Sequence, residues 1–239
     1  MSKGTAEATF HPRVAIVTGA GRGIGRATAL AFARHGIAVA LASRRPADLM
    51  AVEAQIEEMG GRALALPTDV SATAEVKKLV EETERTLGDI DLLVNNAGVV
   101  EPNLIVATSD ESWDRVLDVN LKGAFLCTRA VLAQMIDRRR GRILNVSSIS
   151  GRLGTPRLAS YCASKWGLIG FTKAAAEEVA PHNVQIMAVC PGSVDTEMLA
   201  KGLPGAKPDM APDAVAALLL YLGTEAPDAM NGSAIDMFG

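Results

Sequence analysis

A glycine-rich segment near the start of the chain restricts its possible folds more than any other feature. The apolar run 14–18 reads Val-Ala-Ile-Val-Thr, is typical of a buried strand, and passes directly into Gly19-Ala-Gly-Arg-Gly-Ile-Gly25. A helical pattern follows over 26–35, and Gly36 ends it. This order of strand, glycine turn and helix predicts a βαβ unit that binds a dinucleotide. Glycines let the backbone approach the pyrophosphate, which is attracted to the positive end of the helix.

Apolar strand patterns and helical patterns continue to alternate along the rest of the 239 residues. Further strands are expected at 38–42, 62–67, 90–94, 142–147, 184–190 and 233–238, and further helices at 49–59, 74–87, 112–135, 160–179 and 212–222. Such alternation predicts an α/β fold, a Rossmann-type doubly wound parallel sheet of about seven strands with helices on both faces. We expect one domain over residues 1–239, with residues 1–12 as a loose leader.

Tyr161 and Lys165 are four residues apart within a predicted helix, so their side chains lie on one face. A neighbouring ammonium favours the phenolate, and we expect it to lower the tyrosine pKa from about 10. A tyrosine tuned in this way can protonate a carbonyl oxygen or accept a proton from an alcohol. Taken alone, however, such a pair more often belongs to a half-exposed helix face, with the phenol packed and the lysine in water.

The spacing Thr18-Gly19-x-x-x-Gly23-x-Gly25 resembles the glycine motif of the short-chain dehydrogenase/reductase family. Other motifs follow in the order and spacing of that family: Asn95-Asn96-Ala97-Gly98, Asn120, Ser148, Tyr161-x-x-x-Lys165, and Pro191-Gly192 followed by Thr196. The resemblance runs from about residue 14 to the C-terminus. It implies a nicotinamide-dependent enzyme that interconverts a carbonyl and a secondary alcohol.

The resemblance also implies a role for each matching residue. Tyr161 would be the general acid or base, and Ser148 would donate a hydrogen bond to the same substrate oxygen. Lys165 would hold the nicotinamide ribose and tune the tyrosine, while Asn120 would hold a water in a proton relay. The implied cofactor-binding residues are Gly19, Arg22, Gly23, Ile24, Gly25, Ser43, Arg44, Asp69, Val70, Asn96, Ala97, Gly98, Tyr161, Lys165, Pro191, Gly192, Val194 and Thr196.

The form of the cofactor follows from charge. An acidic residue at the end of the second strand binds both ribose hydroxyls of NAD and repels a 2′-phosphate. This chain has Ser43 there, followed by Arg44 and Arg45, and Arg22 lies inside the glycine turn. Guanidinium groups match a phosphate in geometry and charge, so we expect NADP(H) rather than NAD. The alternative is that Arg44 and Arg45 only solvate the start of the next helix.

The substrate is less constrained. A 3-oxoacyl thioester is our leading expectation, because many bacterial-type members of the family of this length reduce one. Reduction of a sugar, polyol, steroid or xenobiotic carbonyl is the alternative. In a different class, the chain would be a non-catalytic dinucleotide sensor or scaffold, although such proteins commonly lack the tyrosine or lysine.

The substrate lid expected at 195–211 is shorter than in many family members. It has Gly202, Pro204, Gly205 and Pro208 in place of a clear helix pair. We therefore expect a more open cleft.

The resemblance also implies a homotetramer, or failing that a dimer. The contact between subunits would involve the two long helices at 112–135 and 160–179. Four small or apolar positions on these helices would permit it: Ala124, Leu132, Leu168 and Ala175.

Composition argues against several other classes. The net charge is −3, whereas nucleic-acid binding normally needs a basic face. Cys127, Cys162 and Cys190 give neither a disulfide framework nor a metal-ligand spacing, so we expect no metal and a reducing compartment. With no apolar signal segment and no run long enough to span a bilayer, the expected location is the cytoplasm, with no membrane partner.

Overall fold

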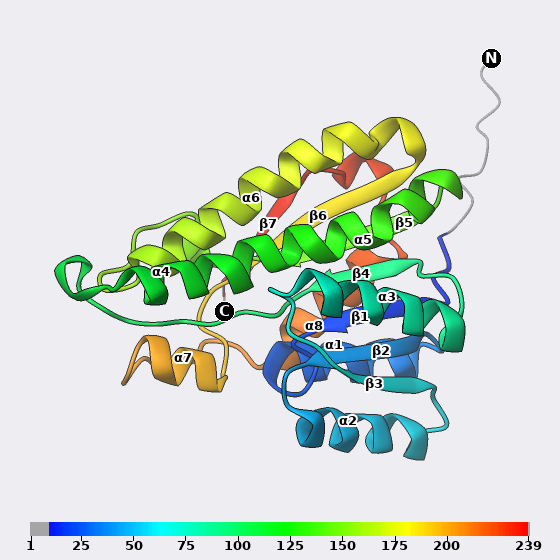
Figure 1. The fold of residues 1–239 in the computed structure, drawn as a ribbon, viewed down its shortest axis with the longest axis horizontal. Coiled ribbons are helices and arrows are strands. Elements are labelled where there is room, and N and C mark those ends of the chain that lie inside the picture. The colour runs from blue at the N-terminus through cyan, green and yellow to red at the C-terminus, as the bar shows by residue number, and fades with distance from the viewer. Residues whose placement is uncertain (1–9, 239) are drawn as a thin grey trace.

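The computed structural model describes residues 10–238. Seven strands form one parallel sheet in the order β3-β2-β1-β4-β5-β6-β7 (Figure 1). The predicted doubly wound parallel sheet is therefore confirmed. The strands are β1 (Val14–Thr18), β2 (Ala38–Ser43), β3 (Ala63–Pro67), β4 (Leu92–Asn95), β5 (Gly141–Val146), β6 (Val184–Pro191) and β7 (Ala234–Met237).

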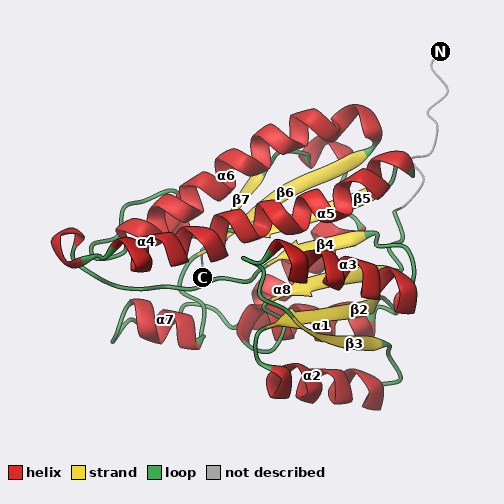
Figure 2. Ribbon diagram, viewed as in Figure 1, coloured by secondary structure: helices red, strands yellow, loops and turns green. Residues whose placement is uncertain are grey.

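Helices cover both faces of this sheet (Figure 2). One face packs against α1 (Gly23–Arg34), α2 (Pro46–Glu58) and α8 (Pro212–Thr224). The other face packs against α3 (Thr73–Leu87), α5 (Gly123–Asp137) and α6 (Ala159–Val179). Within the described residues, no helix combines the length and the apolar character needed to cross a membrane.

Strand β1 shows why the central strands have continuous apolar sequences. Ala15 and Val17 belong to the core beneath α1, α2 and α8, whereas Val14 and Ile16 belong to the opposite core. Successive side chains of a strand point to opposite faces, so a strand buried on both sides needs an apolar residue at every position.

The region expected to be one helix over 112–135 is divided into three segments. Helix α4 (Asp110–Leu117) leads into a π-helical turn over Asp118–Lys122, and α5 continues from there. Asn120 lies within the wide turn, and its side chain bonds both main-chain polar groups of Val99. Single π-helical turns are rare and are frequent at functional sites.

Residues 1–9 of the expected leader lie outside the described residues. Of its last three residues, Pro12 is buried and Phe10 is half-buried, whereas His11 is exposed. The Phe10 ring lies 4.7 Å and 4.6 Å from the guanidinium carbons of Arg140 and Arg142. The lid segment 195–211 forms one short helix, α7 (Glu197–Gly202), which lies at the edge of the molecule beyond the sheet (Figure 1).

The four helix positions expected to permit contact between subunits pack inside the chain instead of facing outwards. Ala124, Leu168 and Ala175 are buried within the single chain, and Leu132 packs partly against the same core. These helices instead expose Phe125 of α5, at 40%, and Trp166 of α6, at 54%. Both helices have apolar residues around most of their circumference, so their sequences did not distinguish the core face from the outer face.

Candidate active site

A cleft of about 800 Å³ lies where the loops that follow strands β1 to β6 converge. This is the carboxyl edge of the sheet, where open α/β folds bind their ligands. All site residues expected from the sequence line the cleft, except Gly25 and Asn120. The fold therefore brings together positions from 19 to 196 in the sequence.

The glycine turn after β1 is held in place by the loop that follows the neighbouring strand β4. The Thr18 hydroxyl accepts hydrogen bonds from the N–H groups of Asn96 and Ala97, both at 3.0 Å. The Asn96 side-chain amide donates back to the carbonyl oxygens of Thr18 and Gly19, at 2.9 and 3.3 Å. Gly25 supports the turn from behind, since a Cβ there would lie 2.2 Å from the Gly19 oxygen. This bracing by Thr18 was not foreseen from the sequence.

The start of α1 fits an anionic ligand. Arg22 is the N-cap residue, no side chain caps the helix, and its first turn contains no acidic residue. The first N–H groups of a helix have no partner within it, so they are available to a pyrophosphate. Gly19 and Gly23 have φ values of +67° and +51°, which favour glycine at both positions.

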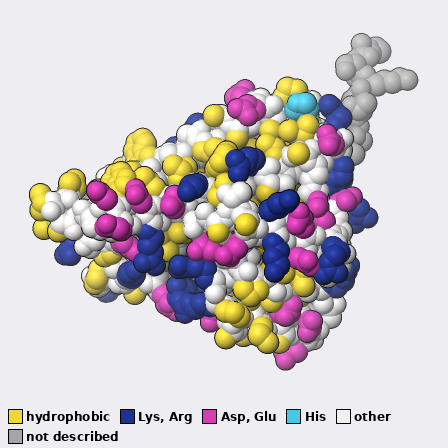
Figure 3. Space-filling view, viewed as in Figure 1, with side chains coloured by type: hydrophobic (Ala, Val, Ile, Leu, Met, Phe, Trp, Pro, Cys, Tyr) yellow, Lys and Arg dark blue, Asp and Glu magenta, His cyan; other side chains and the backbone are white. Residues whose placement is uncertain are grey.

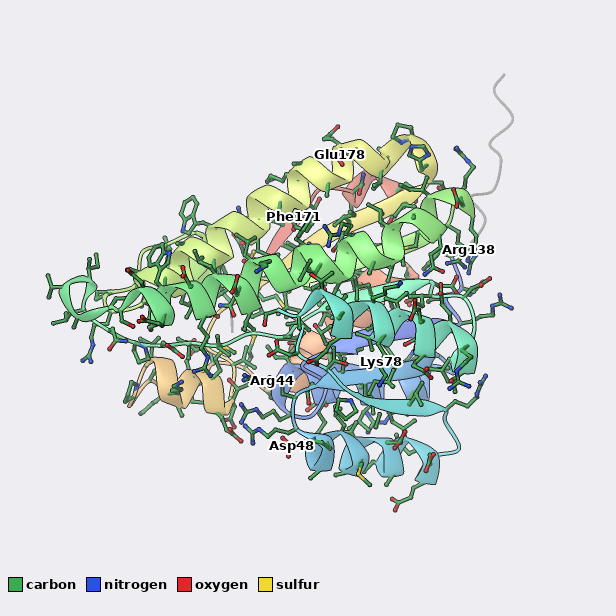
Figure 4. The ribbon with its side chains drawn as sticks, in the orientation of Figure 1. Arg44, Asp48, Lys78, Arg138, Phe171 and Glu178 are labelled. Atoms are coloured by element: carbon green, nitrogen blue, oxygen red, sulfur yellow. The ribbon has the colours of Figure 1, made fainter. Side chains whose placement is uncertain are left out.

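Basic residues collect at one end of the cleft. Arg22, Arg44 and Arg45 line it together with Ser43, and Lys and Arg side chains gather between α7 and α2 (Figure 3). Asp48, which the sequence did not single out, lines the same end, and its carboxylate lies 3.6 Å from the Arg45 guanidinium. Figure 4 labels Asp48 and Arg44 at this end. Arg22, Arg44 and Arg45 outnumber the carboxylates of Asp48 and Glu197 at this end.

A second acidic residue, Glu197, was also missed. It is the first residue of α7 and forms an exposed ion pair with Arg22 across the cleft. The two residues are 175 positions apart in the sequence, so no local pattern could have revealed the pair. The lid is thus joined directly to the glycine turn.

Tyr161 and Lys165 lie side by side near the start of α6, as their spacing predicted. The Lys165 ammonium is 5.6 Å from the centre of the tyrosine ring and donates a 2.8 Å hydrogen bond to the Val146 carbonyl. The Tyr161 hydroxyl points towards the thioether of Met198, with 3.9 Å between oxygen and sulfur. Ser148 lies two residues beyond the end of β5, and its hydroxyl oxygen accepts a hydrogen bond from the Ser150 N–H at 3.1 Å.

Burial dominates the ionisation of this pair. It raises the pKa of Tyr161 to about 12, although the interaction with Ser148 acts in the opposite direction. It also lowers the pKa of Lys165 to about 8. The expected lowering of the tyrosine pKa by the lysine is therefore wrong for the structure without ligands. Removal from water penalises the charged form of each group more than the neighbouring charge favours it.

Both amide hydrogens of the Asn120 side chain are donated to other groups of the protein. Its amide donates to the Val99 carbonyl and the Ser164 hydroxyl, both at 3.0 Å, and its oxygen accepts from the Val99 N–H at 2.7 Å. Ser164 in turn donates to the Tyr161 carbonyl. Asn120 thereby connects the π-helical turn to α6, behind the wall of the cleft.

The segment after β6 forms the other side of the cleft. Pro191, Gly192, Val194 and Thr196 all line it. The Thr196 hydroxyl caps α7 by accepting a hydrogen bond from the Leu199 N–H at 3.2 Å. Its methyl group lies 3.1 Å from the place where a Cβ on Gly23 would be, so the lid rests on the glycine turn.

Asp69 and Val70 follow β3 at the edge of the cleft. The Asp69 carboxylate accepts hydrogen bonds from both the N–H and the hydroxyl of Ser71, and the hydroxyl bond contributes most to lowering its pKa. Val70 packs against the start of α5, where a Cβ on Gly123 would come within 2.8 Å of it.

Comparison with known proteins agrees with this arrangement. The model of the short chain dehydrogenase family matches residues 13–205. A 3-oxoacyl-[acyl-carrier-protein] reductase of Synechocystis sp. is 45% identical over 78% of this chain and 76% of its own. The 3-oxoacyl-[acyl-carrier-protein] reductase FabG of Thermotoga maritima is 37% identical over 95% of this chain and 96% of its own.

Two solved structures of similar proteins have the same fold as this chain. A short-chain type dehydrogenase/reductase from Mycobacterium marinum superposes with a TM-score of 0.90, at 34% identity, covering 95% of this chain and 94% of the other. A variant of the actinorhodin polyketide ketoreductase, solved with NADPH, has a TM-score of 0.89 at 32% identity and covers 95% and 96%. Shared sequence over most of the chain and a shared fold lead to one conclusion: this protein is an oxidoreductase of the short-chain dehydrogenase/reductase family.

Proposed function

We propose that this enzyme uses NADPH to reduce the ketone of a 3-oxoacyl thioester to a secondary alcohol. The observation that carries this proposal is the placement of Tyr161, Ser148 and Lys165 in one cleft, whose other end holds three arginines. The names of the relatives support the substrate class, because the Synechocystis and Thermotoga proteins are both named as 3-oxoacyl reductases.

The dinucleotide, when bound, supplies the hydride that the ketone carbon accepts. Tyr161 gives its phenolic proton to the ketone oxygen, and Ser148 donates a hydrogen bond to that oxygen as negative charge develops there. The raised pKa of Tyr161 keeps this proton in place at neutral pH, which suits reduction. Lys165 stands next to the phenolate that results and stabilises it.

Proton resupply would pass through Lys165. Both amide hydrogens of Asn120 are already used by Val99 and Ser164. A water that joins Lys165 to solvent would therefore be held by the main-chain carbonyl of Asn120 rather than by its amide group. The π-helical turn at this position supports that role, because single π-helical turns are frequent at functional sites.

The preference for NADPH is supported by the charge at the basic end of the cleft. Ser43 provides no carboxylate against a 2′-phosphate, and Arg44 offers a guanidinium close by. The actinorhodin ketoreductase, whose structure was solved with NADPH, supports the same form. A comparison of kcat/KM should favour NADPH over NADH, and a preference for NADH would contradict this part of the proposal.

The substrate class can be tested by following NADPH oxidation with a panel of carbonyl compounds. The panel should contain 3-oxoacyl thioesters, a sugar ketone, a steroid ketone and simple aldehydes. We expect the highest kcat/KM with the thioesters. A higher kcat/KM with another class of carbonyl compound would identify that class as the substrate instead. Tight NADPH binding without any turnover would indicate a sensor instead of an enzyme.

We also propose that the chain forms a homotetramer through α5 and α6. These helices expose Phe125 and Trp166. Phe125 makes an edge-on contact with Phe171 of α6, with 6.3 Å between ring centres, and Figure 4 labels Phe171. Exposed aromatic side chains are typical of the centres of protein interfaces. Light scattering should give about four times the chain mass of 25.0 kDa, and a mass equal to one chain would contradict the proposal.

A further inference from the structure

The lid residue Met198 lies where a substrate ketone would meet Tyr161. Its sulfur is 3.9 Å from the Tyr161 hydroxyl oxygen, and its methyl carbon is 3.5 Å from the position of a Cβ on Gly98. From α7, the Met198 side chain therefore reaches both the loop after β4, at Gly98, and Tyr161 on α6. A ketone oxygen bound to Tyr161 would lie about 2.7–2.8 Å from its hydroxyl, so it would compete with the thioether for this contact.

The surroundings of Met198 are apolar. Tyr161 forms a small buried cluster with Val100, Val116 and Leu158, and Met198 packs against this cluster. A substrate that reaches the hydroxyl thus passes between aliphatic side chains. This environment fits an acyl chain better than a polyol, because no hydrogen bonds are lost when an aliphatic chain enters it.

The backbone of the lid fixes the position of Met198, whereas its side chain can change conformation. Thr196 caps α7, Glu197 pairs with Arg22, and Gly202 packs so close to Val100 that a Cβ would come within 3.2 Å. A methionine side chain has three rotatable bonds and adapts to irregular spaces. A thioether is also a weak hydrogen-bond acceptor, so the contact with Tyr161 is easily replaced by a ketone oxygen.

We propose that Met198 determines the acyl-chain specificity of the enzyme. In the free enzyme its thioether occupies the place of the ketone. In the complex it swings aside and packs along the acyl chain next to the reacting carbon, so its bulk limits the chains that fit. This inference rests on the proposed function and goes beyond it, since it assigns specificity to one lid residue.

The test compares kcat/KM for 3-oxobutanoyl and 3-oxodecanoyl N-acetylcysteamine thioesters. Met198→Ala should raise the ratio of the long to the short substrate by about tenfold, because a methionine side chain has about the volume of several methylene groups. Met198→Leu keeps the volume without sulfur and should restore the wild-type ratio to within about twofold. A lid that is only loosened would lower both kcat/KM values together and leave their ratio unchanged.

Met210→Ala is the matched control. Met210 belongs to the same lid segment, but it pairs with Val194 through the main chain and packs against the core beneath α8. This variant should keep the wild-type ratio. A ratio that changes equally in Met198→Ala and Met210→Ala would overturn the proposal.

A second measurement is independent of turnover. With methyl-labelled methionine, the Met198 signal is identified by its absence in Met198→Leu. It should shift when 3-hydroxydecanoyl N-acetylcysteamine is added, while the Met210 signal stays in place. If wild-type enzyme turns over the thioesters but Met198→Ala keeps the wild-type ratio, the Met198 proposal alone fails. If wild-type enzyme reduces no thioester, the proposed function fails and the Met198 proposal fails with it.

Discussion

The Lys165 ammonium donates a 2.8 Å hydrogen bond to the Val146 carbonyl, which fixes the lysine against the strand that leads to Ser148. The side chain is only 4% exposed. Strand β5 therefore positions two members of the site, Ser148 through the chain itself and Lys165 through this bond. The cost of the arrangement is a cation held away from water.

This burial makes stability depend on pH. The pKa of Lys165 is lowered from 10.5 to about 8, so between these values the unfolded chain binds more protons than the folded chain. The folded state therefore gains stability as the pH rises from about 8 to 10.5. Relative to Lys165→Met, the wild-type free energy of unfolding should rise by up to about 3 kcal/mol over this interval.

Urea unfolding at pH 7.5 and pH 10.5 measures this difference. Lys173→Met, which removes an exposed lysine from the same helix, is the matched control for the loss of a charge. A difference between wild type and Lys165→Met that stays constant with pH would contradict the burial of a charged Lys165.

Tyr161 should resist ionisation in the free enzyme. The chain has two tyrosines, so the Tyr221→Phe variant retains Tyr161 as its single phenol. Because burial raises its pKa to about 12, less than about a tenth of this tyrosine should be ionised at pH 10. In urea, about half should be ionised at the same pH. Ultraviolet absorbance of the phenolate measures both fractions, and half ionisation in the folded protein would refute the raised pKa.

Much of this fold could be predicted from local sequence. The first four residues of β1 are apolar, which indicated a central strand, and the glycines after it indicated the ligand edge of the sheet. The spacing of Tyr161 and Lys165 correctly placed both on one helix face. These predictions succeeded because each depends on residues close together in the chain.

Features that depend on distant contacts were missed. The pairing of Arg22 with Glu197 and the contact of Tyr161 with Met198 join segments brought together only by the folded sheet. The pKa shift of Tyr161 was predicted in the wrong direction. The local sequence shows the neighbouring lysine, but it does not show that folding removes the phenol from water. The π-helical turn was missed because it depends on hydrogen bonds from Asn120 to a loop about twenty residues earlier.

The Arg22–Glu197 ion pair should compete with the cofactor. Both side chains are largely exposed, so the pair itself is weak, but it occupies a guanidinium that could bind a phosphate. Glu197→Gln should therefore lower the Kd for NADPH by about two- to fivefold, the range expected for an exposed ion pair. Calorimetric titration measures this change.

The matched control is Glu81→Gln, which breaks an exposed ion pair with Lys77 on α3. It should leave the Kd for NADPH unchanged. Weaker NADPH binding in Glu197→Gln would show instead that the ion pair helps to form the cofactor site.

The central claim is that Tyr161 supplies the proton to the substrate, and the Tyr161→Phe variant tests it most directly. Its kcat with 3-oxobutanoyl N-acetylcysteamine should fall by at least about 100-fold, the usual scale for losing a general acid. Its Kd for NADPH should stay close to the wild-type value. A variant that binds NADPH normally and still turns over at a rate near that of the wild type would contradict the role of Tyr161.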